Sequence, residues 1–194
     1  MLQTCEIRWF FSEPPVDLDR ILSDHTEVQE RTDWYILPAN AECGVKLREG
    51  SLEMKLRCAS YGERNFCDLV GYLEIWKKWS LVFGDVEAAP SLEELAGTGW
   101  LDVDKKRYLQ RFHVDGERVS VASERPLNGC EFEVTELMVE GHPHWTVGFE
   151  AVGELIKLES NLATVCQHIA TRQAFRQPFT RDNSYGYAQW LAQR

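Results

Sequence analysis

Residues 44–57 read GVKLREGSLEMKLR and alternate with a two-residue period on both sides of Glu49-Gly50. This pattern predicts a β-hairpin, because a turn there sets apolar residues opposite apolar ones and Lys46 opposite Glu53. Gly50 suits the left-handed second position of such a turn. The predicted pairs are Val45 with Met54, Lys46 with Glu53, Leu47 with Leu52 and Arg48 with Ser51. One face of the hairpin is therefore charged and must meet either water or an anion.

The composition indicates a folded, acidic protein. The chain has 194 residues, 44% of them hydrophobic, and we expect one domain spanning residues 1–194. The net charge of −10 argues against duplex nucleic acid or an anionic membrane as a partner. We find no apolar run of about 18 residues and no signal-peptide pattern. A cytoplasmic protein with reduced cysteines is therefore expected.

The remaining segments predict a mainly antiparallel β protein. The expected strands are residues 4–11, 31–38, 73–83, 103–114, 118–122, 130–139 and 145–152. Helices are expected at 16–23, from Ser91 to Gly97, and across 153–175, where apolar residues recur every three or four positions. Polar residues 24–33 and 59–68 are interpreted as loops, and the aromatic tail 184–191 is expected to dock on the body. The fold class is α+β, with a closed or nearly closed β-barrel and helices packed outside.

Charge along these strands is segregated. Alternate residues of the hairpin and of 103–114 are basic on one face, which we call the basic phase: Lys46, Arg48, Lys55, Arg57, Lys105, Arg107 and Arg111. The acidic phase is the corresponding face of the later strands, with Glu131, Glu133 and Glu150. Such phases can form the solvated outer face of a sheet. If the apolar phase, including Val45, Met54 and Leu56, packs under the long helix, the charged phase instead faces a barrel lumen. Cations crowded there repel by about 4 kcal/mol per close pair at intermediate dielectric, so they need acids, water or a polyanion between them.

The order of these segments resembles the CYTH, or triphosphate tunnel metalloenzyme, superfamily. The similarity rests on VKLREGSLEMKLR, KKRYLQRF, CEFEVTEL and WTVGFEAVG, and spans about residues 4–170. It implies an antiparallel β-tunnel whose basic side chains hold a triphosphate and whose acids hold Mg²⁺ or Mn²⁺. By position, Lys46, Arg48, Lys55, Arg57, Lys105, Arg107 and Arg111 would hold phosphate, and Glu6, Glu131, Glu133 and Glu150 would hold metal.

The N-terminal strand departs from that family. Where the family has Glu-x-Glu-x-Lys, this chain has Glu6-Ile7-Arg8-Trp9-Phe10, so a cation replaces the second acid. Arg8 would then pair with Glu133 or Glu150, or hold phosphate itself. This favours a divergent member that binds a phosphate-rich anion (triphosphate, polyphosphate or organic phosphate) with weak or no hydrolysis. The alternative is a metal-dependent triphosphatase acting on inorganic or nucleoside triphosphate.

Overall fold

The computed structural model describes residues 2–23, 25–37, 40–48, 50–83 and 99–193. The helix expected from Ser91 to Gly97 lies outside these residues. The described strands are β1 (Leu2–Phe11), β2 (Glu27–Ile36), β3 (Cys43–Arg48), β4 (Ser51–Phe66), β5 (Leu69–Val82), β6 (Trp100–Asp115), β7 (Arg118–Ala122), β8 (Gly129–Val139) and β9 (His142–Val152). The helical segments are α1 (Leu18–Ile21), η2 (Leu155–Lys157), α3 (Leu158–Ala170), η3 (Arg181–Asn183) and α4 (Tyr187–Ala192).

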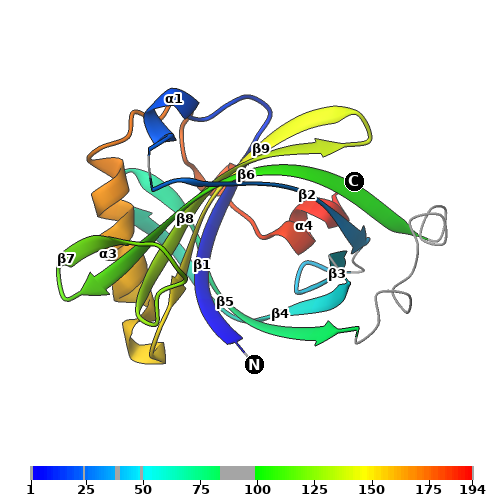
Figure 1. Cartoon of the computed structure of the whole chain (residues 1–194), viewed down its shortest axis with the longest axis horizontal. Coiled ribbons are helices and arrows are strands. Elements are labelled where there is room, and N and C mark those ends of the chain that lie inside the picture. The colour runs from blue at the N-terminus through cyan, green and yellow to red at the C-terminus, as the bar shows by residue number, and fades with distance from the viewer. Residues whose placement is uncertain (1, 24, 38–39, 49, 84–98, 194) are drawn as a thin grey trace.

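The strands close into a barrel, as predicted. Their order is β2-β3-β4-β5-β1-β9-β8-β6-β7, and β2 also pairs with β6, so eight strands form a ring (Figure 1). Every pairing is antiparallel, and β7 pairs with the end of β6. Closure leaves the eight strands of the ring without a free edge, and it separates a lumen from an outer surface.

The central hairpin forms in the predicted register. β3 and β4 pair Val45 with Met54, Lys46 with Glu53, Leu47 with Leu52 and Arg48 with Ser51. Gly50 has a φ of 70°, the left-handed conformation that the turn requires. This register directs Lys46, Glu53 and Lys55 to the same side of the sheet, which is the lumen side.

Two loop predictions are wrong. Residues 27–33 belong to β2, which pairs with β6 along its whole length, and residues 59–66 continue β4 alongside β5. The first error has a clear cause: Gln29, Arg31 and Asp33 point toward the lumen side and bond to charged partners there. A strand whose inner face is polar does not show the apolar alternation by which strands are recognised.

The main hydrophobic core lies outside the ring, between the barrel wall and α3. Alternate residues of β1, β8 and β9 point outward here and meet Leu158, Leu162, Val165, Cys166 and Ile169 of α3. This confirms the predicted long helix, whose α-helical part is Leu158–Ala170. With 13 residues it is the longest described helix, and no helix in the described ranges is long and apolar enough to cross a bilayer.

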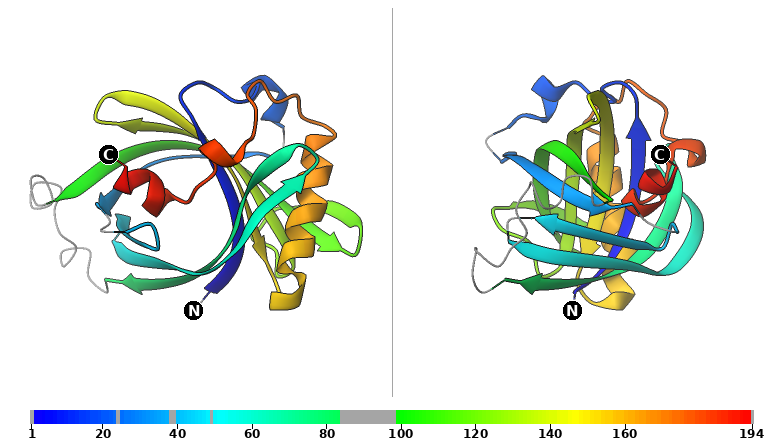
Figure 2. Two further views of the ribbon diagram at one scale, coloured as in Figure 1. Left: turned by 180° about the vertical axis from the view of Figure 1, so that it is seen from behind. Right: turned by 90° about the vertical axis from the view of Figure 1, so that its right-hand side faces the viewer.

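The helix does not cover the hairpin, contrary to expectation. Figure 2 shows α3 on the side of the barrel away from β3 and the start of β4. Met54 and Leu56 are accordingly exposed, at 42% and 39%. The hairpin keeps its charged face in the lumen even so, because barrel closure directs it there.

The C-terminal segment occupies one end of the barrel. In Figure 1 helix α4 lies inside the outline of the ring, and its residues Trp190 and Leu191 are buried in a second core with Phe10, Tyr35 and Leu137. The aromatic tail therefore docks, as predicted, although on the inner side of the barrel. The lumen is narrowed at that end by an aromatic wall.

Candidate functional site

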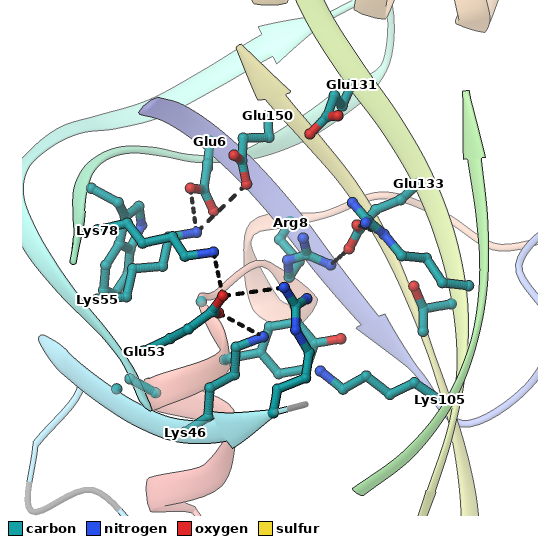
Figure 3. Close-up of a pocket in the computed structure, with 18 of the residues that line it drawn as sticks. Glu6, Arg8, Lys46, Glu53, Lys55, Lys78, Lys105, Glu131, Glu133 and Glu150 are labelled. Carbon is teal, nitrogen blue, oxygen red and sulfur yellow. Dashed lines mark hydrogen bonds and ion pairs between the residues drawn. The ribbon is translucent and has the colours of Figure 1, made fainter. Parts of the chain in front are cut away.

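The barrel contains a cavity of about 300 Å³ that is lined mainly by charged side chains (Figure 3). Ten lining residues are basic and six are acidic. Asp33 and Glu27, which pair with four of these cations from outside the lining, reduce the surplus of positive charge to two. The basic residues are Arg8, Arg31, Lys46, Arg48, Lys55, Lys78, Lys105, Arg107, Arg111 and Arg125. The acidic residues are Glu6, Glu53, Glu74, Glu131, Glu133 and Glu150. This excess contrasts with the net charge of −10 for the whole chain.

The structure brings together every basic residue predicted for the site except Arg57. The guanidinium of Arg57 binds Glu74 at 2.5 Å and the exposed Glu42 at 3.5 Å, and the residue does not line the cavity. Its backbone N–H also donates to the carbonyl of Glu42, which holds this part of β4 against the β2–β3 connection. Arg57 is therefore removed from the candidate site.

Arg8 lines the cavity and is held in place by Glu133 and Tyr187. It forms a salt bridge to Glu133 at 2.5 Å, and its guanidinium lies 4.9 Å from the ring centre of Tyr187. Its register partner on β9 is Gly148, where an added Cβ would come within 2.7 Å of the guanidinium. The absence of a side chain at Gly148 is thus what lets Arg8 lie across β9.

Glu133 is shared by two cations. Arg107 reaches it from β6 at 2.5 Å, opposite the contact from Arg8. Burial disfavours the ionised carboxyl, but the charges of Arg107 and Arg8 outweigh this and hold the pKa of Glu133 well below its usual range. The group is an ionised partner of two arginines at neutral pH.

The other three predicted metal ligands lie in a row across adjacent strands. Glu6 pairs in register with Glu150, and Glu150 with Glu131. Cations separate their carboxylates: the ammonium of Lys55 contacts both Glu6 and Glu150, at 3.6 Å from the latter. Arg125 contacts Glu150 and lies 3.3 Å from Glu131.

As arranged, these acids do not fit the Mg²⁺ or Mn²⁺ that the family resemblance implies. Each has a lysine or arginine partner, so the carboxylates are neutralised by the protein itself. Within residues 2–23, 25–37, 40–48, 50–83 and 99–193, no three His, Cys, Asp or Glu side chains are grouped as a metal ion would require.

A buried cluster of charged residues surrounds Asp33, next to Tyr35 and Tyr187 of the cavity wall. The Asp33 carboxylate binds Lys105 at 2.9 Å, Lys46 at 3.2 Å and Arg31 at 3.1 Å. Lys105 also donates to the Tyr35 hydroxyl at 2.6 Å and lies 4.1 Å from the ring centre of Tyr187. Burial lowers the pKa of Lys105 and of Lys46 to about 8, with the charge of Asp33 opposing that shift.

A second convergence of cations surrounds Glu53. Its carboxylate contacts Lys78 at 2.7 Å, Lys46 at 3.1 Å and Arg48 at 3.2 Å. Burial opposes ionisation, but the charges of Lys46, Lys78 and Arg48 prevail and lower the pKa of Glu53 to about 2. The cluster joins β3, β4 and β5 on the cavity wall.

Sequence reasoning missed several lining residues. Arg31 shares the two-residue period of Asp33 and Tyr35, so a strand reading of residues 27–36 would have placed it on the lumen face. Lys78 was obscured because Lys77 and Lys78 are adjacent and only one can face inward. Arg125 and Tyr187 lie outside the strands, and no local pattern predicts that they reach the cavity.

Comparison with known proteins adds no family assignment. No protein-family model matches the sequence, and no curated protein is found to be similar to it.

Proposed function

We propose that the barrel binds a phosphate-rich anion, such as triphosphate, polyphosphate or an organic phosphate, and hydrolyses it weakly or not at all. The observation that carries this proposal is the gathering of ten basic side chains on the cavity wall, which outnumber the carboxylates around them even when Asp33 and Glu27 are counted. Buried like charges repel, and a polyanion is the ligand that relieves this repulsion in a space of about 300 Å³.

The chemistry of the wall favours phosphate over other anions. Arginine offers a planar set of N–H donors that matches phosphate oxygens, and lysine adds compact positive charge. Arg48, Arg107 and Arg111 come from two strands that lie on opposite sides of β2 in the sheet order. A ligand with several phosphate groups can therefore engage cations from both strands at once.

The closed antiparallel barrel with a charged lumen also supports the proposal that the chain is a divergent CYTH-like protein. The divergence lies at Arg8, which points into the lumen and binds Glu133. A cation fixed there supplies positive charge to an anion in the cavity. The acids that line the cavity in the described part of the chain are already paired with lysine or arginine, which argues for binding over metal-dependent hydrolysis.

A metal-dependent triphosphatase is the second candidate, and one observation favours it. Glu6, Glu150 and Glu131 are neighbours across three strands on the same wall as the cations. This function would require Lys55 to leave Glu6 and Glu150 for the ligand, and Arg125 to leave Glu150, before both carboxylates could hold a metal ion.

A melting experiment tests the binding proposal. Tripolyphosphate, pyrophosphate and ATP are each added to the full chain in EDTA, with sulfate as the control for ionic strength. At about 100 times its dissociation constant, a bound ligand stabilises by about 2.7 kcal/mol, which raises Tm by about 5–10 °C for a chain of this size. No shift with any of the three would contradict the proposal.

Two matched variants locate the site. Arg48→Gln removes a lining cation, whereas Lys106→Gln removes one on the outer face of β6, where Lys106 pairs with the exposed Glu30. We expect the tripolyphosphate shift to shrink in Arg48→Gln and to persist in Lys106→Gln. Equal shifts in both would place binding outside the cavity.

Phosphate release distinguishes the two functions. The chain is incubated with tripolyphosphate or ATP in Mg²⁺ or Mn²⁺, and free phosphate is measured by a colorimetric assay. We expect release no faster than in a protein-free blank. Metal-dependent release that disappears in a Glu150→Gln variant would favour the triphosphatase instead.

A further inference from the structure

Among the acids of the cavity, Glu53 is distinguished by its partners. Three cations from two strands meet at its carboxylate: Lys46 and Arg48 from β3, and Lys78 from β5. Figure 3 shows the contacts of Lys46 and Lys78 with Glu53. Arg48 and Lys78 contact one carboxylate oxygen, and Lys46 contacts the other. Several charged donors gathered on the oxygens of one anion is also how proteins hold a phosphate group.

The surroundings of Glu53 are more open than those of Glu133, although the partners of Glu150, Lys55 and Arg125, are more exposed still, at 33% and 39%. The side chains of Lys78, Arg48 and Lys46 are 31%, 24% and 18% exposed, whereas Arg8 and Arg107 at Glu133 are 10% and 17% exposed. A ligand entering the cavity can therefore reach the cations around Glu53 with less displacement of protein.

We infer that the Glu53 carboxylate occupies an anion subsite of the cavity, and that a phosphate group of the ligand displaces it from Lys46, Arg48 and Lys78. This inference rests on the proposed function and identifies a residue that sets its affinity. Glu53 neutralises three cations that would otherwise repel one another, and it competes with the ligand for the same donors. No covalent bond is made or broken in this exchange, since one anion replaces another at the same ion pairs.

The decisive variant is Glu53→Gln, which keeps the size of the side chain and removes its charge. Its matched control is Glu74→Gln, because Glu74 also lines the cavity and is similarly buried, yet its cation partner Arg57 does not line it. Both variants raise the net charge of the wall by one. Glu53→Gln removes a charged partner from three lining cations, whereas Glu74→Gln removes a charged partner from none.

Calorimetric titration with tripolyphosphate in EDTA gives the readout. We expect Glu53→Gln to bind about tenfold more tightly than the wild type, and Glu74→Gln to change affinity by less than about threefold. Equal gains in both variants would show that only net charge matters and would overturn the inference. Weaker binding by Glu53→Gln would overturn it as well.

The proposed function and this inference fail in different ways. If neither the wild type nor Glu53→Gln binds, the proposed function is wrong and the subsite falls with it. If the wild type binds and Glu53→Gln gains nothing, only the subsite is wrong.

A second measurement needs no variant and covers the case in which Glu53→Gln does not fold. A crystal structure of the wild type with tripolyphosphate should show a phosphate group on at least two of Lys46, Arg48 and Lys78, with the Glu53 carboxylate turned away. A ligand bound elsewhere, with Glu53 still on all three cations, would overturn the inference.

Discussion

Arg8 shows how much of the site is set by single residues. The sequence predicts a cation at this position and gives its pairing with Glu133 as one of three alternatives, and the structure has that salt bridge. The other contacts of Arg8 could not be predicted. Gly148 gives the guanidinium room, Glu133 and Thr146 bind it, and Tyr187 faces it. These contacts come from three other parts of the chain, so Arg8 is held as a fixed element of the cavity.

Gly148→Ala should therefore disturb Arg8 more than the backbone. The new Cβ would lie 2.7 Å from the guanidinium, which must shift and thereby disturb its salt bridge to Glu133. We expect a loss of about 1–3 kcal/mol in the free energy of unfolding, measured in urea, together with weaker tripolyphosphate binding.

Gly44→Ala is the matched control for this prediction. Gly44 also lines the cavity, but an added Cβ would meet only the Cβ of Ala188, at 3.9 Å. Its stability should change by less than about 1 kcal/mol. Equal losses of stability in the two variants would mean that Arg8 does not depend on the missing side chain at Gly148.

The two buried lysines predict a pH dependence of binding. Burial lowers the pKa of Lys46 and of Lys105 to about 8, so both lose their charge as the pH rises through that value. We expect tripolyphosphate affinity to fall about tenfold between pH 7 and pH 9, measured by calorimetric titration. Lys46→Arg, which stays charged, should show a shallower decline. An equally steep decline in that variant would assign the effect to the ligand or to other groups.

Unfolding does not explain such a loss, because the same lysines affect stability with the opposite sign. Their folded pKa of about 8 lies below the ordinary value of 10.5, so the unfolded chain binds more protons between these two values. Their contribution to stability therefore rises with pH in this window. Melting at pH 7 and pH 9 separates the two effects.

At the scale of elements, α4 packs inside one end of the barrel and narrows the lumen there with aromatic side chains. Phe10 stacks on Tyr185 at 5.1 Å and on Trp190 at 4.8 Å between ring centres, so the C-terminal segment is joined to β1. Tyr187 lies over Lys105 and faces Arg8. The element that narrows the lumen thus also positions two of its cations.

Trp190→Ala should detach this element. Trp190 is only 6% exposed, and truncating a buried aromatic side chain costs about 3–5 kcal/mol in the free energy of unfolding. Ile156→Ala, at a residue that is 88% exposed, should cost less than about 0.5 kcal/mol. Urea denaturation measures both. A near-neutral Trp190→Ala would show that α4 does not depend on this core.

Elements with one apolar and one charged face could be predicted from the sequence, and others could not. The β3–β4 hairpin and helix α3 have such a pattern, and both formed where expected. The sequence predicts a loop over residues 27–33 of β2, because the inward residues of this strand are polar and bond to lumen cations. Strands that line a polar lumen therefore lack the apolar alternation by which strands are predicted from sequence.

At the scale of the whole molecule, charge separates in space. The chain is acidic overall, yet its lumen wall has a positive surplus. The sequence predicted which faces of the strands carry each sign, but the ring depends on the pairing of β2 with β6, which links residues 64 to 82 positions apart. Nor could it show that Lys55 and Arg125 neutralise the acids, since these contacts exist only after closure.

The central claim is that this lumen holds a polyphosphate without a metal ion. Calorimetric titration of the full chain with tripolyphosphate in EDTA, at low and at high salt, tests it most directly. The account predicts one ligand per chain, with an affinity that falls as salt screens the wall charges and that Mg²⁺ does not improve. The absence of binding in EDTA, with binding restored by Mg²⁺ or Mn²⁺, would contradict it.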